Sequence, residues 1–377
     1  MSRDALPPVS GTLADVLPAA AAALGLPQRA TLLRLPDAAR VVVVLVDGLG
    51  ERLLAERAGH APFLGGLLAD GHVLECGYPS TTATSMGSFG TGLSSGTHGM
   101  VGYQVRLPGT DRLLNELSWE DGPDPRTWQP QETVLEHLVA RGAAVTRIGP
   151  AFFDGSGLTE ATLRGGRFVA ADSLDERVEA ALAALRGPAP SLVYLYWGDV
   201  DKVGHVRGCA SWEWGEELAA VDLAVRRLAA GAPADTLVLV TADHGMVDVP
   251  AGARTDIAQD AELADGVLLT GGEPRAPMLY TRDGAADDVL ATWRSRLGST
   301  VEVVSREQAV EDGWFGPVAD HVLPRIGDVV AAAVAPVSVH DSRCQRPELA
   351  KLVGMHGGRT PAETRVPLLV VPGRRLG

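Results

Sequence analysis

Short runs of consecutive apolar residues, many of them β-branched, recur along the chain. Runs of this length without a polar interruption are typical of strands that are buried on both faces. Four of them are predicted as strands: residues 41–46 (VVVVLV), 191–197 (SLVYLYW), 236–241 (TLVLVT) and 366–371 (VPLLVV).

Longer stretches between these strands carry apolar residues at helical spacing and end on a glycine, which commonly closes a helix. Three helices are predicted in this way, in residues 131–142, 174–187 and 212–231. Strands that alternate with helices predict an α/β fold, with helices flanking a mostly parallel central sheet.

Residues 255–322 differ from the rest of the chain in their predicted secondary structure. They contain turn signals followed by a short strand, helix, strand, helix pattern. A chain of 377 residues is also longer than a single hydrophobic core usually supports. We therefore predict a small α+β subdomain or cap at residues 255–322, inserted into a core formed by residues 1–254 and 323–377.

The charge of the chain restricts its partners. Its 33 basic and 47 acidic residues give a formal net charge of -14, which argues against binding to a nucleic-acid polymer. Its three cysteines are scattered and form no disulfide framework. No export signal and no apolar run of about 20 residues is visible. We expect a cytoplasmic protein with no membrane contact, and the pattern favours no particular oligomeric state.

Acidic residues directly follow three of the four predicted strands. Ligands of open α/β sheets bind beyond the carboxyl ends of the strands, so these positions are candidates for a site. They are Asp47, Asp199 with Asp201, and Asp243 with His244. An aspartate after a strand most often caps a helix or a turn, so each position by itself is weak evidence.

Histidines accompany these carboxylates at spacings that suit metal binding. Asp201 and His205 are four residues apart, so both side chains can lie on one face of a helical turn. Asp243 and His244 are adjacent, and in an extended chain they would point apart and serve two ions. His356 lies between glycines just before the last strand and would add a sixth ligand. Mixed Asp and His ligands favour two divalent ions that are zinc or manganese rather than magnesium.

Hydroxyl side chains crowd residues 78–92 (YPSTTATSMGSFGTG), where the chain leaves a short predicted strand and begins a helix. Free N–H groups and the dipole at a helix start favour a bound phosphate. Two metal ions could activate one of these serine or threonine hydroxyls as a nucleophile in phosphoryl transfer. Most of the other hydroxyls are expected to cap the helix.

Five segments together resemble the ordered motifs of the type I phosphodiesterase/nucleotide pyrophosphatase family of the alkaline phosphatase superfamily. The segments are LVDGLG (45–50), YPSTTATSMGSFGTGLSSGTHGM (78–100), DKVGH (201–205), TADHGM (241–246) and GMHGG (354–358). The resemblance implies an alkaline-phosphatase-like fold and a hydrolase of phosphodiester or pyrophosphate bonds that acts on a small phosphorylated substrate.

The family pattern places the nucleophile at Thr82 rather than Thr81. The resemblance implies that one zinc ion is held by Asp47, Thr82, Asp243 and His244. It implies that a second is held by Asp201, His205 and His356. In the implied mechanism Thr82 attacks phosphorus, and zinc-activated water then hydrolyses a phospho-threonine intermediate.

The chain departs from the family pattern near the substrate. Nucleotide-cleaving members commonly carry an aromatic residue after the nucleophile, and this chain has Ala83, which puts nucleotide preference in doubt. An asparagine that holds a phosphate oxygen in many members corresponds to Tyr103, whose phenol could donate a hydrogen bond. Lys202 and Arg207 flank the second ligand group and are candidates for contact with a phosphate or a distal charge.

Two histidines are set apart from the site. His98 matches a family histidine that we interpret as structural, and Asp320–His321 follows no predicted strand, so we interpret this dipeptide as unrelated. A phosphomonoesterase on the same site is an alternative function, and a non-catalytic metal-binding protein is an alternative of another class. A mutase or a sulfatase is disfavoured, because the chain lacks a large insertion after Thr82 and a Cys/Ser-x-Pro-x-Arg stretch.

Overall fold

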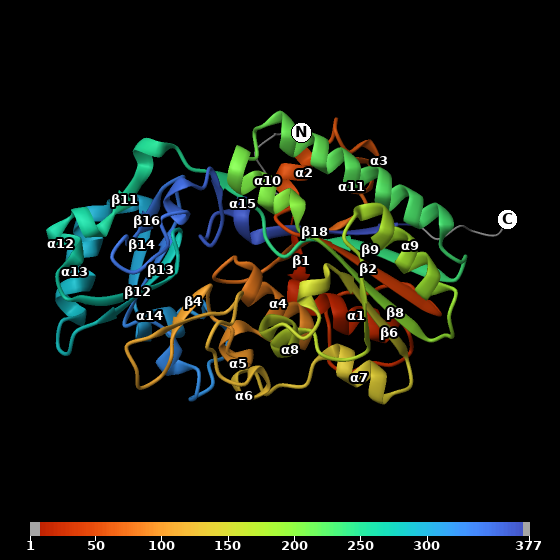
Figure 1. Cartoon of the computed structure of the whole chain (residues 1–377), viewed down its shortest axis with the longest axis horizontal. Helices are drawn as coiled ribbons and strands as arrows, with labels where there is room; N and C mark the ends of the chain where they lie inside the picture. The colour runs from red at the N-terminus through yellow and green to blue at the C-terminus, as the bar shows by residue number, and fades with distance from the viewer. Residues whose placement is uncertain (1–7, 372–377) are drawn as a thin grey trace.

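Eight strands form the central sheet of the larger lobe in the computed structural model, which describes residues 8–371 (Figure 1). Residues 1–7 and 372–377, the two ends of the predicted core, lie outside the described residues. From one edge to the other the strands are β1 (Val9–Thr12), β3 (His72–Glu75), β18 (Arg365–Val371), β9 (Thr236–Thr241), β2 (Arg40–Val46), β8 (Ser191–Trp197), β6 (Ala144–Gly149) and β7 (Arg167–Ala170). Only the pairs made by β18 are antiparallel, which confirms the mostly parallel sheet.

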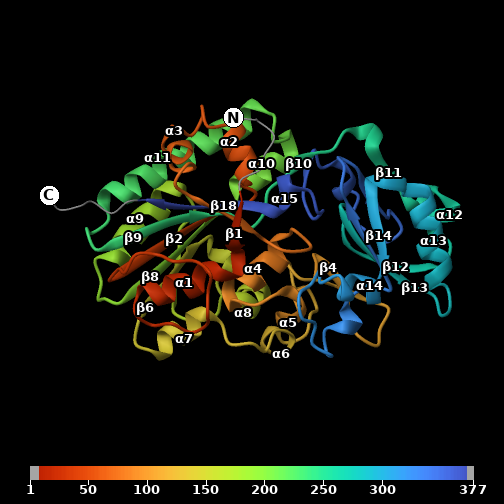
Figure 2. The ribbon, with the colours of Figure 1, turned by 180° about the vertical axis from the view of Figure 1, so that it is seen from behind.

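Helices cover both faces of this sheet, so strands such as β2 are buried on both sides. One face carries α3 (Pro62–Leu67), α9 (Leu174–Leu185) and α11 (Trp212–Gly231), and the other carries α1 (Val16–Ala23), α4 (Thr82–Thr91), α7 (Val134–Ala140) and α8 (Gly157–Thr162) (Figures 1 and 2). The three predicted helices are confirmed as α7, α9 and α11. Capping boxes at Thr133 and Ser173 start α7 and α9.

The smaller lobe contains an antiparallel sheet with its own hydrophobic core (Figure 1). In spatial order its strands are β12 (Val267–Glu273), β13 (Ala276–Thr281), β15 (Val329–Ala333) and β14 (Val301–Ser305). Its helices are α12 (Ala261–Ala264), α13 (Ala286–Leu297) and α14 (Arg306–Glu311). A parallel pair, β11 (Arg254–Asp256) with β16 (Ser338–His340), adjoins it. Because β15 follows residue 322, this sheet extends beyond the predicted inserted segment, and the domain boundaries stay a prediction.

Short elements complete the chain and connect the lobes. They are α2 (Glu51–Glu56), α5 (Ser95–His98), α6 (Pro125–Trp128), α10 (Asp199–Arg207), α15 (Pro361–Thr364), β4 (Gln104–Arg106), β5 (Leu113–Asn115), β10 (Val247–Asp248) and β17 (Gly354–Met355). None of the helices within residues 8–371 combines the length and the apolar character that crossing a bilayer requires.

The topology gathers distant segments at one edge of the central sheet. Strands β9, β2 and β8 are adjacent and parallel, so their carboxyl ends lie at the same edge. Strand β18 is antiparallel to β9 and therefore begins at that edge, which brings the preceding glycine-rich segment there. The antiparallel pair β10 and β17 then joins Val247 to Met355.

Candidate active site

One cluster forms where β2 and β9 end, beside the start of α4. The Nε2 atom of His244 lies 3.4 Å from Oδ1 of Asp47 and 3.5 Å from Oδ2 of Asp243. The hydroxyl of Thr82 lies 3.2 Å from the same nitrogen. Asp47, Asp243 and His244 each offer a ligand atom within 4.8 Å of the others, so one ion could bind all three.

A second cluster lies at the start of α10. Oδ2 of Asp201 is 3.2 Å from Nε2 of His205, and Oδ1 of Asp201 is 3.8 Å from Nε2 of His356. The helical spacing of Asp201 and His205 therefore places both side chains together. His244 belongs to this group as well, because its ring stacks on that of His356 at 3.7 Å and its ligand atom lies within 4.8 Å of those of Asp201 and His356. The two clusters are contiguous, with His244 between them.

Backbone carbonyls orient the three histidines in the same way. Nδ1 of His205 is 2.8 Å from the Gly354 carbonyl, and Nδ1 of His356 is 3.0 Å from the Ser80 carbonyl. Nδ1 of His244 is 3.1 Å from the carbonyl of the next residue. A carbonyl only accepts, so each Nδ1 carries a hydrogen, and each ring in its neutral form presents the Nε2 lone pair to the cluster. The Thr82 hydroxyl therefore donates to His244.

The carboxylates of the cluster hold buried oxygens that lack hydrogen-bond partners. These atoms are Oδ1 of Asp47, Oδ1 of Asp201 and Oδ2 of Asp243. Such groups are costly to bury unless a cation or donor satisfies them. Three unsatisfied oxygens next to three Nε2 lone pairs fit the donor set of zinc or manganese.

The electrostatics of the cluster agree with this fit. Burial raises the pKa of Asp47, and the nearby charges of Asp243 and Asp201 raise it further. Burial also raises the pKa of Asp243. Burial acts in the same direction on Asp201, but the charges of His205 and other histidines outweigh it, so the pKa of Asp201 is lowered. Bound cations would remove the repulsion among the three carboxylates.

The turn before α4 separates the two candidate hydroxyls. Thr81 is the N-cap residue in an extended conformation, and its side chain hydrogen-bonds to Glu273 of the smaller lobe. Thr82 is the first residue of α4 and faces His244. Ser80 binds the glycine-rich segment that follows β17. Its hydroxyl accepts a hydrogen bond from Gly357 N–H and donates one to the Gly358 carbonyl. The geometry therefore presents Thr82 to the clusters.

A cavity of about 470 Å³ opens beside the clusters. Thr82, Asp47 and Asp201 line it together with an aromatic group: Phe152, Phe153, Phe168, Tyr194 and Tyr196. A hollow of similar size, about 520 Å³, lies between α2 and α15, and no residue of the two clusters lines it. The cavity beside Thr82 is therefore the one suited to hold a substrate of the clusters.

Three predicted substrate contacts, Tyr103, Lys202 and Arg207, are not among the residues that line this cavity. Tyr103 does not line the cavity, and its backbone N–H donates to Glu273. The Lys202 and Arg207 side chains are 77% and 62% exposed, and their ion-pair partners are Asp199 and Glu213, each at 3.8 Å. Contact of these three side chains with a substrate therefore stays a prediction. The Asp320–His321 pair belongs to neither ligand group within residues 8–371.

Tyr196 is a site residue that the sequence pattern did not single out. Its hydroxyl donates to Oδ2 of Asp47 at 2.5 Å, and burial raises its pKa, so it stays a donor. A tyrosine inside an apolar strand is usually interpreted as a residue of the hydrophobic core. The signal that could have identified it is the need of a buried phenol for a hydrogen-bond partner, together with its place at the carboxyl end of β8.

Comparisons with solved structures find proteins that share this fold. The murine ectonucleotide pyrophosphatase/phosphodiesterase 5 is 19% identical, with a TM-score of 0.69 over 87% of both chains. Its inactive threonine-to-alanine variant in complex with AMP gives 0.71 over 88% of both chains, also at 19% identity. Phosphonoacetate hydrolase from Sinorhizobium meliloti 1021 is 20% identical, with a TM-score of 0.67 over 90% of this chain and 91% of that one.

These likenesses show the fold, and no curated protein sequence matches the chain. The model of the family named "Type I phosphodiesterase / nucleotide pyrophosphatase" matches residues 41–359, which contain both ligand clusters. The chain therefore belongs to the type I phosphodiesterase/nucleotide pyrophosphatase family, a family of phosphoric ester hydrolases in the alkaline phosphatase superfamily.

Proposed function

We propose that the chain hydrolyses phosphodiester or pyrophosphate bonds of small phosphorylated substrates, with Thr82 as nucleophile and two divalent metal ions as cofactors. The convergence of unsatisfied carboxylate oxygens and histidine Nε2 atoms beside the Thr82 hydroxyl carries this proposal. The ligands named in the related structures, AMP and phosphonoacetate, are small anions that contain phosphorus, which supports the substrate class.

The two clusters would divide the ligands as the family resemblance implies. Asp47, Thr82, Asp243 and His244 would hold one ion. Asp201, His205 and His356 would hold the other. Mixed nitrogen and carboxylate ligands suit zinc in preference to manganese. When bound, two such ions lower the pKa of a coordinated hydroxyl or water and offset negative charge on the phosphoryl oxygens.

The protein residues then act in two displacements. Thr82 Oγ attacks phosphorus, the bond to the leaving oxygen breaks, and that oxygen departs with the electron pair and takes up a proton. Water next attacks the phosphorus of phospho-Thr82, and the Thr82 oxygen leaves and regains a proton. The free N–H groups at the start of α4 bind phosphoryl oxygens, and Tyr196 keeps Asp47 in place.

Substitution of the two threonines tests this proposal. Thr82→Ala is expected to lower turnover of bis-p-nitrophenyl phosphate by at least about 1,000-fold, because no other group replaces the attacking oxygen. Thr82→Ser should keep part of the activity. Thr81→Ala is the matched control, since it removes the adjacent hydroxyl, and it should cost less than about tenfold. Full turnover by Thr82→Ala would overturn the role of this residue.

Metal removal tests the cofactor. Chelation should abolish turnover, and zinc should restore it better than manganese, with two ions per chain measured by mass spectrometry. Retention of activity by fully metal-free protein would contradict the proposal. Preference for p-nitrophenyl phosphate over the diester would indicate a phosphomonoesterase instead.

A further inference from the structure

Arg147 is a buried cation in the wall of the active-site cavity. It lies on β6, is only 7% exposed, and lines the same cavity as Thr82. Its strand neighbours in register are Tyr194 of β8 and Phe168 of β7. Residues in register on adjacent strands share a face of the sheet, so all three side chains project from the face that α4 covers.

The guanidinium of Arg147 has no partner within the described part of the chain. Its Nε and Nη1 atoms are buried and form no hydrogen bond, and it makes no ion pair with a described residue. Its guanidinium carbon lies 5.7 Å from the ring centroid of Phe168, a contact that satisfies no N–H donor. Asp154 and Glu160 act on it only from a distance, and Glu160 is already bonded to Arg126 at 2.9 Å.

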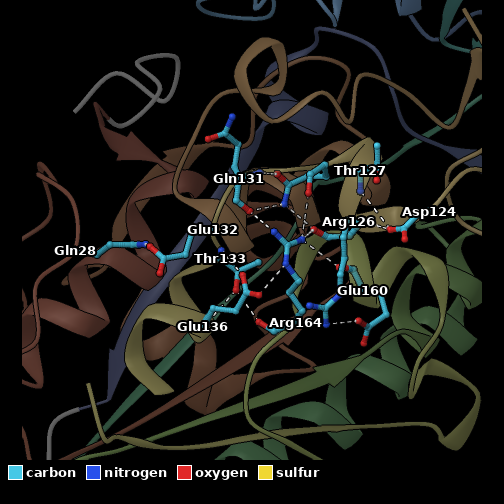
Figure 3. A network of polar contacts seen from close by, with 12 residues as sticks. Gln28, Asp124, Arg126, Thr127, Gln131, Glu132, Thr133, Glu136, Glu160 and Arg164 are labelled. Atoms are coloured by element: carbon cyan, nitrogen blue, oxygen red, sulfur yellow. Dashed lines mark hydrogen bonds and ion pairs between the residues drawn. The ribbon is translucent and has the colours of Figure 1, made fainter. Parts of the chain in front are cut away.

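Arg164 shows how this chain satisfies a buried guanidinium (Figure 3). Its Nε donates to Glu136 at 3.0 Å, its Nη1 donates to the Ala161 carbonyl at 2.8 Å, and its Nη2 donates to the Gln131 carbonyl. Burying a cation without such partners costs several kcal/mol. The unpaired donors of Arg147 therefore leave it free to bind a group from outside the chain, and an anion is the group that a guanidinium binds most strongly.

An anion bound to Arg147 would lie at a distance from the reacting phosphorus. In the central sheet β6 is two strands away from β2, which ends at Asp47. Neighbouring strands are about 4.8 Å apart, so the two strands lie roughly 10 Å apart. The cavity connects both positions. A substrate held at Thr82 can therefore extend along the cavity to Arg147.

We propose that Arg147 is a specificity-determining residue that binds a second anionic group, a carboxylate or a phosphate, on the part of the substrate that extends away from the reacting phosphorus. The substrate class is then a phosphoester or pyrophosphate with two separated negative charges. This inference rests on the proposed function for the position of the reacting group. Phe168 lies beside the guanidinium, and Phe168, Tyr194 and Arg147 all line the cavity.

Matched phosphonate ligands test the inference without turnover. Alkylphosphonates of three to six carbons are compared with the same chains ending in a carboxylate or a second phosphonate, by calorimetric titration of the zinc-restored protein. For at least one length, the doubly anionic ligand should bind wild-type protein at least about tenfold more tightly than the alkylphosphonate. In Arg147→Gln this preference should fall below about threefold, while alkylphosphonate binding changes little. Arg147→Lys should retain part of the preference.

Two controls separate binding from folding. Arg164→Gln removes a paired arginine outside the cavity, so it should lower stability and leave the ligand preference unchanged. Arg147→Met should lose the preference without lowering the melting temperature, because it removes an unpaired buried charge. A melting temperature lowered by Arg147→Met, with the preference of Arg147→Gln intact, would make Arg147 a structural residue and overturn the inference.

Turnover of bis-p-nitrophenyl phosphate distinguishes the two levels of the proposal. If wild-type protein hydrolyses this diester but shows no preference for doubly anionic phosphonates, the inference on Arg147 fails alone. If the preference depends on Arg147 and no diester is hydrolysed, the proposed function fails alone. If no diester is hydrolysed and no doubly anionic phosphonate is preferred, both fail.

Discussion

Four histidines of the larger lobe use their ring nitrogens in two different ways. His205, His244 and His356 each donate from Nδ1 to a carbonyl and present Nε2 to the carboxylates. In His98 the Nδ1 atom accepts from Met100 N–H at 3.1 Å, so its hydrogen is on Nε2, 3.1 Å from the Ser88 hydroxyl. Both nitrogens of His98 are therefore engaged within the fold, which agrees with its interpretation as a structural residue.

His98 should make stability depend on pH. Burial lowers its pKa from 6.5 to about 3. Below about pH 6.5 the unfolded chain binds a proton at His98, whereas the folded chain binds one only near pH 3. His98 therefore costs no stability above pH 6.5, and the folded state loses stability as the pH falls from 6.5 towards 3. Over this window the free energy of unfolding should fall by about 1.4 kcal/mol per pH unit from His98 alone.

Urea unfolding of wild-type and His98→Gln proteins between pH 4.5 and 7.5 measures this effect. The variant is expected to be less stable at neutral pH and to lose less stability on acidification, so the two curves converge. Parallel curves would show that the imidazole is not held neutral by the fold.

At the scale of elements, α4 depends on two glycines three residues apart. A Cβ atom at Gly87 would lie 2.4 Å from the His98 ring, and a Cβ atom at Gly90 would lie 1.7 Å from the Thr162 carbonyl oxygen at the end of α8. These positions have ordinary helical backbone, so close packing rather than backbone freedom requires glycine there. The glycine-punctuated run thus seats the helix that carries Thr82 against α5 and α8.

Gly90→Ala should lower the free energy of unfolding by about 3 kcal/mol, because α8 must move to admit the methyl group. Activity should fall as well, since α4 positions Thr82. Gly66→Ala in α3 is the matched control. A Cβ atom there meets nothing within 4 Å, so alanine should stabilise the helix by up to about 1 kcal/mol. Urea unfolding measures both, and equal effects would rule out packing as the cause.

At the scale of the whole molecule, one buried ion pair joins the two lobes. Arg275, in the turn between β12 and β13, donates from Nε and Nη2 to the two carboxylate oxygens of Glu363 at 2.7 and 2.6 Å. Both side chains are fully buried. Glu363 also accepts from Gly358 N–H, close to His356. The smaller lobe therefore supports the loop that carries a predicted metal ligand.

Arg275→Met should destabilise the protein by about 3 to 5 kcal/mol, because it leaves the Glu363 carboxylate buried without its main partner. The double variant Arg275→Met/Glu363→Met should cost less than the sum of the single changes. Glu302→Gln, which removes a partly exposed pair with Arg359 across the same lobes, should cost less than about 1 kcal/mol. Thermal unfolding compares these variants, and equal losses for Arg275→Met and Glu302→Gln would contradict the role of burial.

Much of the fold could be predicted because its main signals are local. An uninterrupted β-branched run such as residues 41–46 is stable only inside a covered sheet, and an amphipathic stretch with a glycine at its end is typical of a helix. The cap prediction was less complete, because β15 pairs with β13 and β14 through contacts that no short segment encodes. The predicted cytoplasmic location stays a prediction.

The sequence by itself determined which residues could serve the site. Asp47, Asp201, Asp243 and His244 follow strands, and parallel strands end at a common edge of a sheet. Only the tertiary structure decided that His244 lies between both ligand groups, that Tyr196 donates to Asp47, and that Arg147 is buried without a partner. The physical reason is that side-chain patterns encode burial and backbone conformation locally, whereas distances between groups on separate strands follow from the order in which the strands pair.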